Sequence, residues 1–211
     1  MLQSMTQNVA VVAGASGLTG SYLRQVLEED AFYDHCRYLT RQDNFANLSP
    51  ERMAGATHLF CCLGTTIAKA GSQQAFRQVD FEYVVNFARA GKLAGASRMM
   101  LVSSVGADPR ASTFYLRVKG EVEQALTGIG FEALHIFRPS VLVGRRPEKR
   151  SGEEWGIRLA MAFEWLLAGS LRKYRPMPAG VLAAAMAAAG ERGAAGVHIH
   201  HFDEIHRLCG A

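Results

Sequence analysis

Tyr115 and Lys119 form a Y-x-x-x-K pair in a segment, Thr113 to about Thr127, that the apolar spacing predicts to be helical, with Gly128 as its stop signal. Side chains four residues apart lie on one face of a helix. A lysine ammonium beside a tyrosine favours the phenolate and makes the phenol a usable acid and base near neutral pH. The same ammonium can hold ribose hydroxyls. The spacing therefore indicates a proton-transfer pair, although a half-buried tyrosine beside a solvated lysine would give the same pattern.

Two serines precede this pair. Ser103 and Ser104 end a predicted strand, and Tyr115 follows them by twelve and eleven residues. A serine hydroxyl at the end of a strand can orient a substrate carbonyl or stabilise developing negative charge. We assign this catalytic role to Ser104 and a cofactor contact to Ser103, while the residues alone leave open which serine is catalytic.

A glycine-rich loop lies near the start of the chain. Residues 14–20 read GASGLTG, a G-x-x-G-x-x-G motif between a predicted strand and a predicted helix, which is the context that this motif requires. Glycines let the backbone approach a pyrophosphate, and the helix N-terminus offers free N–H groups. The predicted phosphate-binding residues are Gly14, Ser16, Gly17, Leu18, Thr19 and Gly20. The alternative is a generic strand-to-helix turn that needs flexible residues.

The end of the second predicted strand bears on the choice of dinucleotide. NAD-binding proteins usually place an acidic residue there, whereas this chain has Thr40-Arg41. A guanidinium holds a 2′-phosphate with charge-assisted hydrogen bonds, so Arg41 favours NADP over NAD, unless it is an ordinary solvated arginine. Leu63 and Gly64 end the next predicted strand, and the glycine there would permit close approach of a ribose.

Strands and helices alternate along the chain. The predicted strands are 8–13, 36–40, 58–63, 99–102, 131–137 and 197–201. The predicted helices are about 18–27, 73–93, 113–127, 155–166 and 181–189, with a helical turn at Ser49-Pro50 and a short helix after the last strand. This alternation predicts an α/β fold with a Rossmann-like, doubly wound parallel sheet.

Composition narrows the class of protein. The chain has 211 residues, 49% hydrophobic and 20% charged, which excludes global disorder and fits one domain with its own core. The longest apolar run, Val181–Ala189, is too short to span a membrane, and the first basic residue is Arg24, so a secretory signal is not expected. Four cysteines without CxxC spacing favour a reducing, cytoplasmic location. The net charge of +4 is compatible with an anionic ligand.

Several motifs together resemble a known family. They are GASGLTG (14–20), FCCLGTT (60–66), KAGSQQAFRQVD (69–80), VSSVGAD (102–108), FYLRVKGEVE (114–123) and FRPSVLVG (137–144). With these motifs, which cover about residues 8 to 170, the chain resembles the atypical, epimerase-like branch of the short-chain dehydrogenase/reductase superfamily. The closest resemblance is to the Tat-interacting oxidoreductase-like proteins.

The resemblance implies a role for individual residues. For the cofactor, it assigns Ser16 to Thr19 to the phosphate loop, Arg41 to the 2′-phosphate, and Leu63 and Gly64 to the ribose. It also assigns Tyr115 and Lys119 to the active-site pair, Leu142 to the nicotinamide side and Arg150 to a second cofactor contact.

The sequence departs from the family pattern at two places. Gln42 follows Arg41 where the family tends to have a second arginine, which weakens the preference for NADP. Only eighteen residues separate Arg41 from Phe60, so the third strand of the family is expected to be missing or vestigial, which puts the adenine pocket in doubt.

These observations predict an NADP-dependent oxidoreductase that transfers a hydride between the nicotinamide and a small carbonyl or alcohol. The alternative is a non-catalytic NADP(H)-binding module that acts through a protein partner. Nucleic-acid binding by the basic run 145–150 is disfavoured because that run is short and lacks aromatic residues. A metal site at His198 and His200 is disfavoured because no acidic or thiol partner is evident.

The expected organisation is one NAD(P)-binding domain over residues 1–211, with a small substrate-side portion from about residue 138 to 211. Few residues remain after the cofactor-binding part, so the substrate pocket should be small and open, or completed by a partner. No membrane partner is expected, and neither the substrate nor the oligomeric state follows from the sequence.

Overall fold

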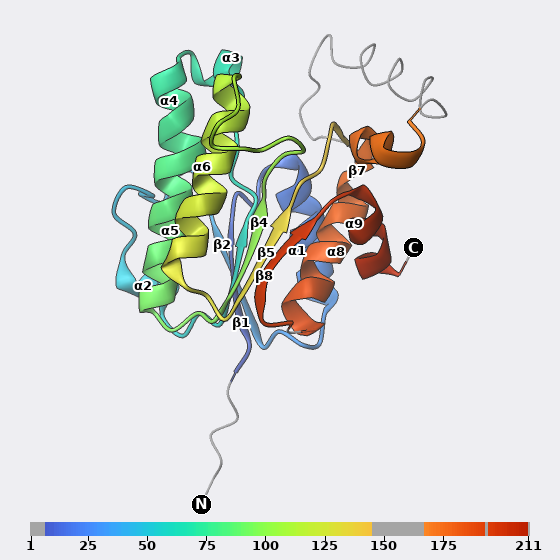
Figure 1. The fold of residues 1–211 in the computed structure, drawn as a ribbon. Helices are drawn as coiled ribbons and strands as arrows, with labels where there is room; N and C mark the ends of the chain where they lie inside the picture. Colours follow the sequence, from blue (N-terminus) through green and yellow to red (C-terminus); the bar gives the residue numbers. More distant parts are fainter. Residues whose placement is uncertain (1–6, 145–166, 193, 211) are drawn as a thin grey trace, which may run out of the picture.

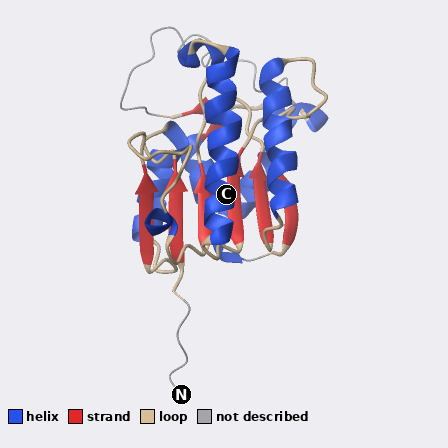
Figure 2. Ribbon diagram, turned by 90° about the vertical axis from the view of Figure 1, so that its left-hand side faces the viewer, coloured by secondary structure: helices blue, strands red, loops and turns tan. Residues whose placement is uncertain are grey.

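The computed structural model describes residues 7–144, 167–192 and 194–210. Six parallel strands form the central sheet, in the order β2-β1-β3-β4-β5-β8 (Figures 1 and 2). The strands are β1 (Val9–Ala13), β2 (His35–Leu39), β3 (His58–Cys61), β4 (Arg98–Val102), β5 (Ala133–Phe137) and β8 (Gly196–His200). The predicted α/β fold with a doubly wound parallel sheet is confirmed.

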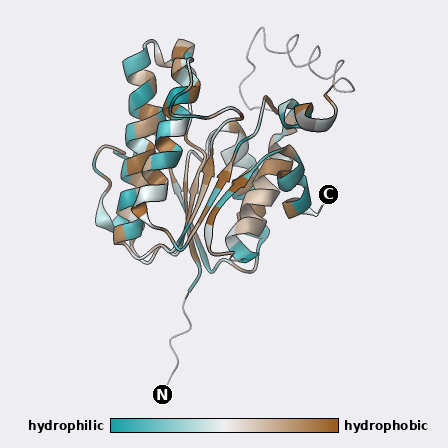
Figure 3. Ribbon diagram, viewed as in Figure 1, coloured by the Kyte–Doolittle hydropathy of each residue, from teal (hydrophilic) through white to brown (hydrophobic). Residues whose placement is uncertain are grey.

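Helices cover both faces of this sheet (Figure 1). One layer holds α2 (Pro50–Met53), α4 (Gln73–Arg77), α5 (Tyr83–Leu93) and α6 (Phe114–Ile129). The other holds α1 (Leu18–Glu29), α8 (Ala179–Arg192) and α9 (Phe202–Cys209). Because strand side chains alternate, Val11 of β1 packs into the core under the first layer, and its neighbours Ala10 and Val12 pack under the second. Figure 3 shows the apolar strands between the two helix layers.

The interval between β2 and β3 contains no strand. Residues 40–57 are all described and form turns and the short helix α2. Strand β2 therefore lies at the edge of the sheet and pairs only with β1. The expectation that the family's third strand is missing is confirmed, and the physical reason is the polar, interrupted sequence of this interval.

Two helix boundaries differ from the predictions. The expected continuous helix 73–93 is interrupted by η1 (Gln78–Glu82), a π-helical turn between α4 and α5. Helix α6 does not stop at Gly128 but continues to Ile129 and ends at Gly130. Gly130 has a φ of 76°, the left-handed conformation that ends a helix, whereas Gly128 keeps helical geometry.

Some short elements were not expected from the sequence. They are α3 (Ile67–Ala70), the parallel two-residue strands β6 (Leu142–Val143) and β7 (Met177–Pro178), and η3 (Gly169–Tyr174). Helix α8 confirms and extends the predicted helix 181–189. The predicted helix 155–166 lies outside the described residues. Among the helices described, none combines the length and apolar character that a membrane span requires.

Candidate functional site

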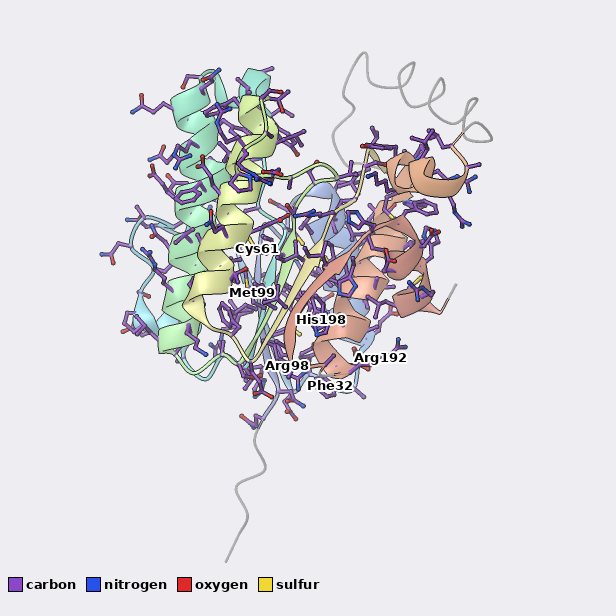
Figure 4. All side chains as sticks on the ribbon, viewed as in Figure 1. Phe32, Cys61, Arg98, Met99, Arg192 and His198 are labelled. Atoms are coloured by element: carbon purple, nitrogen blue, oxygen red, sulfur yellow. The ribbon has the colours of Figure 1, made fainter. Side chains whose placement is uncertain are left out.

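All strands of the sheet are parallel, so the loops that follow them converge at the edge formed by the carboxyl ends of the strands. In Figure 4 this edge lies on the side of Cys61, near the end of β3, and opposite Arg98, at the start of β4. A cavity of about 580 Å³ lies at this edge. Its lining includes six predicted cofactor-binding residues, Gly14, Ser16, Gly17, Arg41, Leu63 and Gly64. Tertiary structure thus brings the glycine loop and the ends of β2 and β3 to one cavity.

The backbone of the glycine loop requires its first and last glycines. Gly14 has a φ of 83°, and a Cβ atom there would lie 2.7 Å from the carbonyl carbon of Cys62. A Cβ atom at Gly20 would lie 2.1 Å from the Gly14 oxygen. The loop therefore packs backbone against backbone, and α1 begins after its N-cap residue Gly17 with its first N–H groups unpaired within the helix.

Leu18, Thr19 and Gly20 form the first turn of α1. Thr19 is 5% exposed, and its hydroxyl oxygen is buried without a hydrogen-bond partner among the described residues. No acidic side chain lies in this turn. A helix N-terminus with free donors and no local negative charge fits a pyrophosphate.

Arg41 lines the cavity, is exposed, and forms no ion pair with the residues that the structure describes. Sequence reasoning missed Asp43, an acidic residue on the same wall. Its carboxylate accepts a 2.6 Å hydrogen bond from the Thr40 N–H and pairs with Arg52 at 2.7 Å. The negative charge of Asp43 is therefore compensated, which leaves Arg41 as a cation available to a ligand anion.

Aromatic side chains from two elements form part of the cavity wall. Phe45, in the loop after β2, stacks on Tyr83 of α5 with ring centroids 5.9 Å apart. Both residues line the cavity, together with the exposed Lys69 of α3. The short interval between β2 and β3 thus supplies an aromatic wall where the longer family members are expected to have a strand.

The two serines after β4 have different surroundings. Ser103 is buried, and its hydroxyl donates a 2.5 Å hydrogen bond to the Glu123 carboxylate of α6. Arg138, which follows β5, also binds Glu123, with Nε at 3.0 Å and a second contact through Nη2. Ser104 is half-buried, and its hydroxyl makes only a 3.4 Å contact to the Val105 carbonyl. The Ser103 hydroxyl is therefore held in a buried hydrogen-bond network with Glu123 and Arg138, whereas the Ser104 hydroxyl can donate to a ligand.

Tyr115 and Lys119 lie on α6 as predicted, but Lys119 is not solvated. Its Nζ lies 2.8 Å from a carboxylate oxygen of Asp80, and both side chains are buried. The pKa of Lys119 is raised above its ordinary value: burial lowers it, but attraction to Asp80 and to Tyr115 outweighs that effect. The ammonium therefore stays charged beside Tyr115, whose ring packs 5.5 Å from Phe76.

The cavity adjoins the predicted Tyr115–Lys119 pair at Gly64. A Cβ atom built on Gly64 would lie 3.7 Å from Lys119 Nζ and 3.5 Å from Asp80 Oδ1. A ligand in the cavity that passes over Gly64 would therefore come close to the Lys119 ammonium. Asp80 was missed by sequence reasoning, although its position among the apolar residues of the 73–93 stripe was a signal that it is buried.

Two predicted cofactor-binding residues remain, Leu142 and Arg150, and the structure describes only Leu142. Leu142 lies in β6 and packs against the core cluster that also contains Ala15 of the glycine loop. Nearby, a Cβ atom on Gly144 would lie 3.1 Å from the Leu18 side chain, so this segment passes beside the start of α1. Arg150 lies outside the described residues.

Within the described part of the chain, no group of three histidine, cysteine or acidic side chains is placed to hold a metal ion. His198 and His200 stack with His135 in a cluster of rings, with 2.9 Å between His135 Nδ1 and His200 Nε2.

Burial raises the pKa of the Cys61 thiol to about 12, so that thiol stays neutral.

No family model matches the chain. Protein HTATIP2 of Rattus norvegicus is 37% identical over 166 residues, which cover 70% of this chain and 68% of that protein. Protein FMP52, mitochondrial, of Coccidioides immitis is 31% identical over 182 residues, which cover 74% of each chain.

Solved structures share the fold at low sequence identity. MoeE5 in complex with UDP-glucose and NAD superposes with a TM-score of 0.71 and 14% identity, over 92% of this chain and 76% of that one. A dTDP-4-dehydrorhamnose reductase from Bacillus anthracis in complex with NADP has a TM-score of 0.66 and 14% identity, over 97% and 80%. The fold is thus that of NAD(P)-binding reductases and epimerases. The chain belongs to the family of HTATIP2 and FMP52.

Proposed function

We propose that the protein is an NADP(H)-dependent oxidoreductase that transfers a hydride between the nicotinamide and a small carbonyl or alcohol substrate. The observation that carries this proposal is the convergence of three groups at one edge of the sheet: the glycine loop, Arg41, and the Tyr115–Lys119 pair that adjoins the cavity at Gly64. The loop offers N–H groups to a pyrophosphate, and the arginine offers a guanidinium to a third phosphate.

Each active-site residue has a proposed role. The cofactor, when bound, supplies the hydride chemistry. Tyr115 gives a proton to the substrate oxygen during reduction and takes it back during oxidation. Lys119 holds ribose hydroxyls and favours the phenolate of Tyr115, and Ser104 donates a hydrogen bond to the substrate oxygen. Ser104 is preferred to Ser103 because the Ser103 hydroxyl is engaged by Glu123.

The preference for NADP over NAD is supported by the local charges. Arg41 is free of acidic partners in the described residues, and the one carboxylate beside it on the cavity wall, Asp43, is paired with Arg52. Lys69 adds a second positive charge to the same lining. The solved neighbours include proteins bound to NAD and to NADP, so the proposal rests on these residues and not on the fold.

The remaining proposals concern organisation and location. We propose a single domain, with residues 138–211 on the substrate side and a small, open substrate pocket. The cysteine usage favours the cytoplasm, whereas several relatives carry the word mitochondrial in their names.

A second candidate function is a regulatory module that binds NADP(H) without turnover and acts through a protein partner. The burial of Asp80 against Lys119 favours it, because a compensated ammonium activates Tyr115 less strongly than a free one.

Tyr115→Phe separates the two functions. For an oxidoreductase, this variant should bind NADPH in a calorimetric titration about as tightly as the parent, while its turnover of a panel of small aldehydes and ketones falls by about 10²- to 10⁴-fold. Tyr33→Phe is the matched control, because the Tyr33 hydroxyl is buried on the opposite helix layer without a hydrogen-bond partner in the described residues. Binding of NADPH without turnover of any carbonyl by the parent would favour the regulatory module.

A further inference from the structure

Asp80 lies in the π-helical turn η1 and is fully buried. One carboxylate oxygen is 2.8 Å from Lys119 Nζ, and the other accepts a 2.9 Å hydrogen bond from the Thr65 N–H. A π-helical turn interrupts the regular hydrogen-bond pattern of an α-helix and is frequently found at functional sites. Here the turn places a carboxylate between the helix that carries Lys119 and the loop that follows β3.

We propose that Asp80 is the counter-ion of Lys119 and sets how strongly that lysine promotes ionisation of Tyr115. This inference rests on the proposed function, since it deepens the role of the Tyr115–Lys119 pair. A carboxylate 2.8 Å from an ammonium gives the pair a net charge near zero. Tyr115 therefore experiences a dipole, whose influence falls off faster with distance than that of an isolated cation.

Other described charged groups around the pair do not supply this compensation. Arg77 of α4 forms an ion pair with Glu121 of α6, so those two charges cancel each other. Cys61 of β3 faces Lys119 as a neutral thiol because of its burial. Glu123 of α6 is held by Arg138 and Ser103. Asp80 is thus the acidic group whose removal would change the net charge beside Lys119.

The same carboxylate also positions the ribose side of the cavity. By accepting the Thr65 N–H, Asp80 holds the backbone after Gly64 close to Lys119 Nζ. Asp80 is a positioning residue in this sense, since it acts through Lys119 and the loop and touches neither cofactor nor substrate in the proposed arrangement.

Asp80→Asn tests the inference in the protein without cofactor or substrate. The readout is the ultraviolet absorbance of the Tyr115 phenolate during a pH titration, obtained by subtracting the curve of the Tyr115→Phe form of each variant. Loss of one negative charge from the pair should make Tyr115 ionise at lower pH, with about tenfold more phenolate at a given pH. An unchanged or higher midpoint overturns the inference. Glu121→Gln is the matched control, because it removes a carboxylate from α6 whose partner is Arg77.

A second variant covers the case in which Asp80→Asn does not fold, since a buried lysine without its partner is destabilising. Asp80→Asn with Lys119→Met removes both charges and leaves none unpaired. If Asp80 compensates Lys119, Tyr115 should ionise in this double variant within about threefold of the parent's phenolate fraction at a given pH. A larger drop in that fraction would show that Lys119 acts as an uncompensated cation in the parent, and the inference would fail. Neither titration requires turnover, so absence of oxidoreductase activity would count against the proposed function alone.

Discussion

Arg41 lines the cavity with no acidic partner among the described residues, while its neighbour Asp43 forms an ion pair with Arg52. Loss of the guanidinium should therefore remove the attraction for a 2′-phosphate without exposing a new negative charge. Arg41→Ala is expected to weaken NADPH binding by about 10- to 100-fold and to leave NADH binding nearly unchanged.

Calorimetric titration of both dinucleotides measures this difference. Arg89→Ala is the matched control, because Arg89 is an exposed arginine of α5 outside the cavity lining. Equal losses of NADPH and NADH affinity in Arg41→Ala would contradict the assignment of Arg41 to the 2′-phosphate.

The two serines after β4 should separate stability from catalysis. Ser103→Ala removes a buried hydrogen bond to the Glu123 carboxylate, which then keeps only its contacts to Arg138, so the free energy of unfolding should fall by about 1–3 kcal/mol. Ser104→Ala removes a hydroxyl with only a long contact to Val105, so it should leave stability within about 0.5 kcal/mol and lower turnover. Urea unfolding and carbonyl reduction measured on both variants check the prediction; the reverse pattern would make Ser103 the catalytic serine.

At the scale of elements, helix α6 has to approach the loop that follows Ser104. A Cβ atom at Gly120 would lie 2.2 Å from the carbonyl carbon of Asp108, so a glycine is required where the helix meets this backbone. The loop also bonds to the first turn of α6, through the Asp108 N–H and the Leu116 carbonyl. The packing of α6 on this loop therefore sets the relative placement of Ser104 and Tyr115.

Two glycines of α6 offer a matched comparison. Gly120→Ala should destabilise the fold by about 1–3 kcal/mol through overpacking and disturb the active-site pair. Gly128→Ala should stabilise it by about 0.5–1 kcal/mol, because nothing lies within 4 Å of a Cβ atom there and alanine favours the helix. Thermal and urea unfolding of both variants measure the difference; a neutral Gly120→Ala variant would mean that the loop can move away without cost.

At the scale of the whole molecule, buried histidines should make stability depend on pH. Burial lowers the pKa of His58, His135 and His200 to about 4 in the fold. In the unfolded chain histidine titrates near pH 6.5, so between about pH 6.5 and 4 the unfolded state binds more protons. Their stabilising contribution is therefore present at neutral pH and is lost as the pH falls through this window.

The free energy of unfolding should fall by about 2–4 kcal/mol between pH 7 and pH 5. This is less than three independent histidines would give, because His135 and His200 are in contact with each other and do not titrate independently. Urea unfolding followed by circular dichroism at several pH values measures this slope. His200→Asn should flatten it, and His35→Gln, at an exposed position, should not. A parent protein equally stable at pH 5 and pH 7 would contradict the prediction.

The sequence by itself determined the features that depend on local spacing. Apolar runs and helical periodicity predicted the six parallel strands and the main helices, and the short interval after Arg41 predicted the missing third strand. The glycine loop was recognisable because the same few residues must turn the backbone and begin α1. The buried Asp80 in the stripe of Phe76 and Tyr83 was not predicted, and neither was its ion pair with Lys119.

Only the tertiary structure decided which groups neutralise one another. Lys119 is paired with Asp80 from another helix, Ser103 with Glu123, and Asp43 with Arg52. These partners come from different elements, and periodicity within one element cannot specify which side chains meet when a helix packs on a sheet. The effect of a charged group on its neighbours depends on its ion-pair partner and its burial. The electrostatics of the site therefore follow from packing and not from the motif alone.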